Sequence, residues 1–141
     1  MNWLTNIVQG IRADDNVIRV LAVMAKDSDR QVLSQIGEKA KWHIEFASNY
    51  ESAVELAGRR KFAVILCDRD LSSAFNWREA VQKLAGIAPG SCVMLTSPVN
   101  DDVLWQEVID RGGYDVLTKP FHEERVVRSV RFACSSWNKS I

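Results

Sequence analysis

The chain has 141 residues, 47% hydrophobic and 26% charged, a composition typical of a single folded domain rather than a disordered or collagen-like chain. Eighteen Lys and Arg residues balance 18 Asp and Glu residues, so there is no overall basic field for nucleic acid. No apolar run is long enough to cross a bilayer, and the N-terminus lacks the pattern of a secretory signal. The three cysteines are odd in number and widely spaced, which favours reduced thiols in a cytoplasmic protein.

Short apolar runs alternate with segments of helical spacing along most of the chain. The run FAVILC at 62–67 is typical of a strand covered on both faces, whereas Val32, Leu33 and Ile36 recur at helical spacing. In chain order, the predicted elements are a strand at 17–23, a helix at 28–41, a strand at 42–47, a helix at 49–60, a strand at 62–67, a helix at 77–84, a strand at 91–95, a helix at 101–111, a strand at 114–118 and a helix from 123 to about 136. This alternation predicts an α/β fold with a parallel sheet between two layers of helices.

The two ends of the chain lie outside this pattern. Residues 1–16 place Trp3, Ile7 and other apolar residues on one face of an expected N-terminal helix. That helix is expected to pack on its own domain, with a dimer contact or a membrane-surface role as the alternatives. We expect one domain over 17–136 and a short tail over 137–141.

Polar side chains follow three successive predicted strands at the points where they end. Asp68 follows the third strand, Thr96 and Ser97 follow the fourth, and Lys119 follows the fifth. Since the carboxyl ends of parallel strands meet at one edge of a sheet, these groups are expected to converge. A carboxylate nucleophile, a hydroxyl donor and an ammonium are a set suited to phosphoryl transfer.

The segments FAVILCDRDL, VMLTS and GGYDVLTKPF make the chain resemble the response-regulator receiver domain of two-component signalling, the fold of the bacterial chemotaxis response protein. The resemblance implies a doubly wound, flavodoxin-like fold with strand order 2-1-3-4-5. It implies that Asp68 is the phosphoacceptor and Thr96 the switch hydroxyl, with Ser97 beside it. It also implies that Lys119 binds the phosphoryl group and precedes a cis peptide bond to Pro120.

The sequence departs from the family pattern at the end of the first strand. Receivers carry two acidic residues there to hold Mg²⁺, whereas an alignment on Arg30 puts Met24 and Ala25 at these positions. Neither residue is a ligand for a hard cation, which prefers oxygen. Only Asp68 and the backbone carbonyl of Asp70 remain, so Mg²⁺ binding is expected to be weak or absent.

Further departures surround the same edge of the sheet. Lys26 can supply positive charge near the phosphoacceptor, or it points into solvent. Asp27 or Ser28 is expected to cap the following helix, although a shifted alignment brings Asp27 nearer to the site. Val116 stands where receivers commonly carry the aromatic residue of the switch, and Tyr114 lies too early in the strand to replace it.

The expected function is that of a stand-alone receiver in a phosphorelay, without enzymatic activity beyond weak self-phosphorylation. Its partners would be a histidine kinase or phosphotransfer protein, a downstream protein and a possible second copy, with no nucleic acid or membrane. Trp105 is a candidate anchor for a partner. The alternative is a pseudo-receiver, an interaction module that works without phosphorylation. A flavin-binding electron carrier is a third possibility, but AKDSDR after the first strand is a poor phosphate-binding loop.

Overall fold

The computed structural model of the chain describes residues 17–139, with side chains described as far as residue 136. The helix expected within residues 1–16 lies outside the described residues. This helix therefore stays a prediction. The elements in chain order are β1 (Arg19–Val23), α2 (Asp27–Ala40), β2 (His43–Ala47), α3 (Tyr50–Arg59), β3 (Val64–Asp68), α4 (Trp77–Ile87), β4 (Cys92–Ser97), α5 (Asp102–Asp110), β5 (Asp115–Thr118) and α6 (Glu123–Lys139).

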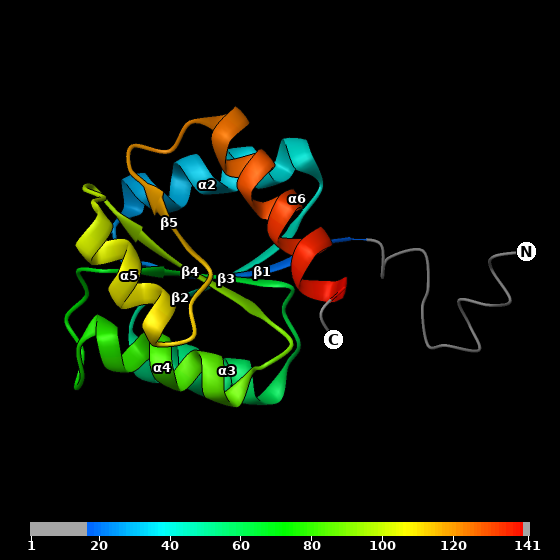
Figure 1. Cartoon of the computed structure of the whole chain (residues 1–141). Helices are drawn as coiled ribbons and strands as arrows, with labels where there is room; N and C mark the ends of the chain where they lie inside the picture. Colours follow the sequence, from blue (N-terminus) through cyan, green and yellow to red (C-terminus); the bar gives the residue numbers. More distant parts are fainter. Residues whose placement is uncertain (1–16, 140–141) are drawn as a thin grey trace, which may run out of the picture.

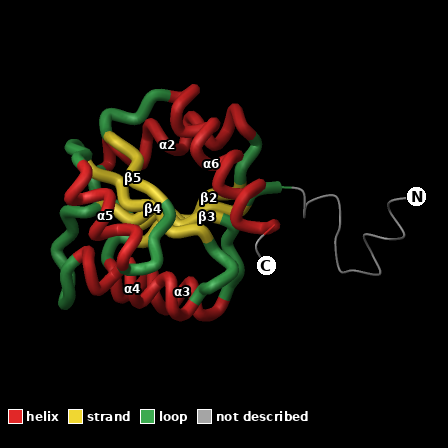
Figure 2. The backbone as a smooth tube through the Cα atoms, in the orientation of Figure 1, coloured by secondary structure: helices red, strands yellow, loops and turns green. Residues whose placement is uncertain are grey.

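The strands form one parallel sheet of five strands in the order β2-β1-β3-β4-β5, which confirms the predicted topology. Helices α2 and α6 cover one face of the sheet, and α3, α4 and α5 cover the other (Figures 1 and 2). The result is the three-layer, flavodoxin-like arrangement expected when every strand is followed by a helix.

The core consists of two apolar clusters, one on each face of the sheet. Successive side chains of a strand point to opposite faces. In β3, Ile65 and Cys67 therefore pack toward α3 and α4, while Val64 and Leu66 pack toward α2 and α6. Every residue of β3 is buried, which explains why its sequence is a continuous apolar run.

The boundaries of several helices differ from the sequence prediction. Helix α2 begins at Asp27, with Lys26 at the N-cap and no side-chain cap, so the prediction that Asp27 or Ser28 caps it is wrong. Helix α6 runs to Lys139 and so takes in part of the segment expected as a tail at 137–141. The cap of α5 is Asp101, whose side chain accepts a hydrogen bond from the Leu104 amide.

The sheet register brings the predicted site residues to one edge. Asp68 at the end of β3 is the register partner of Thr96 at the end of β4. The amide of Lys119, just after β5, donates to the carbonyl of Ser97 over 2.9 Å. The backbone therefore fixes all three strand exits side by side before any side chain is considered. Within the described residues, no helix is long and apolar enough to cross a membrane.

Candidate functional site

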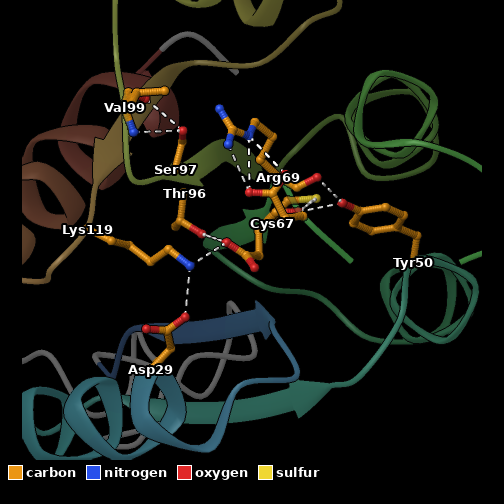
Figure 3. A network of polar contacts seen from close by, with 10 residues as sticks. Asp29, Tyr50, Cys67, Arg69, Thr96, Ser97, Val99 and Lys119 are labelled. Carbon is orange, nitrogen blue, oxygen red and sulfur yellow. Dashed lines mark hydrogen bonds and ion pairs between the residues drawn. The ribbon is translucent and has the colours of Figure 1, made fainter. Parts of the chain in front are cut away.

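Asp68, Thr96 and Lys119 converge at the carboxyl end of the sheet, as the sequence predicts (Figure 3). The Thr96 hydroxyl donates a hydrogen bond to Asp68 Oδ1 over 3.1 Å, and Lys119 Nζ lies 2.9 Å from the same oxygen. Both contacts go to Oδ1, so no described residue hydrogen-bonds the other carboxylate oxygen, Oδ2. The Asp68 carboxylate is thus held by one oxygen and presents the second.

Lys119 has a second carboxylate partner that the sequence reasoning missed. Its Nζ lies 2.8 Å from Oδ2 of Asp29, the third residue of α2. Burial lowers the pKa of Lys119, but the hydrogen bonds to Asp29 and Asp68 outweigh this effect, and its pKa lies above the usual 10.5. The ammonium is therefore charged throughout the physiological range and is shared between two carboxylates.

A cleft of about 600 Å³ opens above these groups. Its lining includes residues from the ends of β1, β3, β4 and β5 and from the first turn of α2: Ala25, Lys26, Asp29, Asp68, Asp70, Leu71, Pro98, Lys119 and Pro120. The peptide bond between Lys119 and Pro120 is cis, as predicted. Lys26 is exposed on the rim, while Lys119 is the cation in contact with Asp68. The positive charge beside Asp68 therefore comes from the residue that follows β5.

The loop that follows Asp68 is fastened to the start of α3 by contacts with no signal in the sequence pattern. The buried Tyr50 hydroxyl lies 2.6 Å from the backbone oxygen of Asp68 and 2.8 Å from that of Arg69. The Tyr50 amide donates to the Ser73 hydroxyl, and burial raises the pKa of the Tyr50 phenol. These bonds tie the exit of β3 to the start of α3.

Other predicted site residues lie away from the Asp68 carboxylate. The Ser97 hydroxyl donates to the backbone oxygen of Val99 over 2.7 Å, so it closes a turn before α5 and does not face Asp68. Asp27 is exposed in the first turn of α2 and is not among the residues that line the cleft. Val116 is buried in the core cluster toward α3 and α4, where it fills the expected switch position with an aliphatic side chain.

The residues at the end of β1 do not fit the magnesium site that the resemblance implies. Met24 is buried in the apolar cluster beneath α2 and α6, and Ala25 at the cleft has no oxygen ligand in its side chain. The Asp70 carboxylate is paired with Arg69. In the described part of the chain, no group of three or more His, Cys, Asp or Glu side chains is arranged to hold a metal.

A model of the response regulator receiver domain matches residues 20–131. The chain belongs to this family. The match runs from the second residue of β1 to the middle of α6, and it includes Asp68, Thr96 and Lys119. No curated protein matches the sequence.

Solved receiver structures share the fold at low sequence identity. A CheY-like receiver protein from Methanospirillum hungatei JF-1 superposes with a TM-score of 0.80 at 16% identity, over 89% of this chain and 99% of that chain. The chemotaxis protein CheY4 of Vibrio cholerae gives 0.76 at 23%, over 83% and 98%. The beryllofluoride-activated NtrC4 receiver domain dimer gives 0.77 at 24%, over 84% and 98%.

Proposed function

We propose that this receiver domain works in a phosphorelay, where it accepts a phosphoryl group on Asp68 and signals through altered protein contacts. The observation that carries the proposal is the meeting of Asp68, Thr96 and Lys119 in one cleft. A carboxylate at a strand end can also serve as a helix cap. That role does not explain why the Lys119 ammonium and the Thr96 hydroxyl both contact Oδ1 of Asp68.

The transfer follows from the two unequal oxygens of Asp68. Oδ2 attacks the phosphorus of a phosphohistidine, the bond from phosphorus to the histidine nitrogen breaks, and that nitrogen keeps the electron pair. Lys119 then balances charge on the phosphoryl oxygens, and the Thr96 hydroxyl turns from Oδ1 to one of them. The protein is the acceptor of the group and not an enzyme, apart from slow self-phosphorylation from a small donor.

A pseudo-receiver is the second candidate, and two specific observations favour it. Met24 and Ala25 leave the end of β1 without acids, and Val116 leaves the fold without the switch aromatic. In this reading, the domain binds its partners in a single conformation and Asp68 stays unmodified. Both candidates signal by protein contact, and they differ in whether the carboxylate reacts and whether the contacts then change.

The proposed partners are proteins. The donor is a histidine kinase or phosphotransfer protein in the cytoplasm, with no contact to nucleic acid or membrane. Exposed apolar side chains at and before α5, namely Val99, Val103 and Trp105, offer a face for a downstream partner or a second copy. The NtrC4 receiver is described as a dimer, and a homodimer is a proposal for the present chain.

The two candidates are separated by incubating the protein with acetyl phosphate, with and without Mg²⁺, and measuring the intact mass. The phosphorelay proposal expects a gain of one phosphoryl group that Asp68→Asn abolishes. An unchanged mass in the native protein after prolonged incubation would favour the pseudo-receiver. A gain that persists in Asp68→Asn would refute Asp68 as the acceptor.

A further inference from the structure

The ammonium of Lys119 is fixed from two sides. Asp29 Oδ2 accepts from Nζ at 2.8 Å and Asp68 Oδ1 lies at 2.9 Å (Figure 3). All three side chains are largely buried. An ammonium has three N–H bonds in a tetrahedral arrangement. With two directions set by carboxylates, the direction of the third is also set.

Asp29 reaches this position because the start of α2 is itself fastened to the end of β1. The neighbouring Arg30 donates to the backbone oxygen of Met24 over 2.7 Å and to the Ser48 hydroxyl over 2.8 Å. Its guanidinium also lies 5.2 Å from the centre of the Phe46 ring. A carboxylate in the first turn is further favoured by the positive end of the helix.

We propose that Asp29 is a positioning residue for phosphoryl transfer at Asp68, holding Lys119 so that one N–H bond remains directed to an oxygen of the incoming group. The inference rests on the proposed function and adds a residue to its site. Asp29 of α2 also supplies a carboxylate to the cleft where the end of β1 has none. This carboxylate binds the ammonium rather than a metal. An ammonium oriented before the reaction stabilises the transferring group without reorganising.

The same contact has a defined electrostatic consequence. The Asp29 carboxylate adds negative charge to the cleft, so its removal does not weaken attraction of an anionic phosphodonor. What its removal takes away is the fixed direction of the ammonium. Asp29→Asn is therefore expected to lower the maximal rate of Asp68 phosphorylation by roughly tenfold, while the half-saturating concentration of acetyl phosphate stays the same or falls.

The test compares Asp29→Asn with Asp27→Asn and Asp29→Glu. Asp27 is a matched control, because it is an acidic residue in the same turn of the same helix but is exposed and away from the cleft. The rate is measured by intact mass against acetyl phosphate concentration. The pKa of Lys119 is measured by NMR titration of its ε-methylene signals, assigned with Lys119→Met. This second readout needs no phosphorylation.

We expect Asp29→Asn to lower both the Lys119 pKa and the maximal rate, Asp29→Glu to restore most of each, and Asp27→Asn to change neither. An equal Lys119 pKa in the two Asn variants would overturn the proposal, as would a lowered pKa with an unchanged rate. If the native protein takes up no phosphoryl group, the proposed function fails. The assignment of Asp29 as the residue that holds the ammonium is then decided by the Lys119 pKa alone.

Discussion

Removal of a single oxygen atom, by Tyr50→Phe, is expected to destabilise the receiver measurably. The ring stays in its place against Phe75, 6.0 Å away between centroids. The hydroxyl is lost, and with it the donor to the backbone oxygens of Asp68 and Arg69 at the exit of β3. Tyr50 is fully buried, so water does not readily replace the lost donor.

The size of the effect follows from the burial of these carbonyl groups. A buried acceptor left without its donor costs about 1–3 kcal/mol in the free energy of unfolding. For a domain of roughly 120 residues, the entropy of unfolding is about 0.25 kcal/mol per degree, so the melting temperature should fall by about 4–12 °C. The exposed pair of Glu55 and Arg59 on the same helix supplies the contrast. Glu55→Gln should cost no more than about 0.5 kcal/mol.

Thermal unfolding followed by circular dichroism measures both variants under one condition. A Tyr50→Phe protein that melts within a degree of the native protein would refute the reasoning, because it would mean that the two carbonyl oxygens do not depend on the phenol. A large fall in the melting temperature of Glu55→Gln would also refute it, because the effect of Tyr50→Phe could then not be attributed to burial.

Three further outcomes are expected. Ala25→Asp adds a carboxylate to the cleft beside Asp68, so Mg²⁺ should raise the melting temperature of this variant and speed its phosphorylation while leaving the slower native protein nearly unchanged. An equal response of both proteins would contradict the placement of Ala25. The Glu51 carboxylate accepts hydrogen bonds from its own backbone amide and from a loop amide, and these bonds hold its pKa below 4.5. Its contribution to stability is therefore present above that pH and is lost as the pH falls, so the difference in melting temperature between the native protein and Glu51→Gln should shrink as the pH falls below 4.5. Half-buried Cys134 should react with a maleimide before the two buried cysteines, since burial raises the pKa of Cys92 to about 12. Labelling is followed by intact mass, and simultaneous labelling of all three cysteines would argue against a closed core.

The part of the site that lies on strand ends could be predicted from sequence. Asp68, Thr96 and Lys119 each follow a recognisable apolar run, and parallel strands bring their carboxyl ends together whatever the helices do. The order of strands and helices could also be predicted from the alternation of apolar runs and helical segments. A strand buried on both faces and an amphipathic helix differ in the period of their apolar residues.

The part that depends on how helices pack could not be predicted in the same way. The segment AKDSDR offers two Asp residues, and which of them faces the cleft depends on where α2 begins and how it rests on β1. Asp29 contacts Lys119, whereas Asp27 is exposed to solvent. Tyr50 likewise has no local signal, since its hydroxyl contacts a loop 18 residues away in sequence.

The central claim, that Asp68 is a phosphoacceptor, is tested most directly by locating the modified residue. After incubation with acetyl phosphate, borohydride reduces an aspartyl phosphate to homoserine, and peptide mass mapping identifies its position in the native protein and in Asp68→Asn. We expect homoserine at position 68 of the native protein and nowhere in the variant. Homoserine at Asp29 or Asp70, which also line the cleft, or none at any position after prolonged incubation, would contradict it.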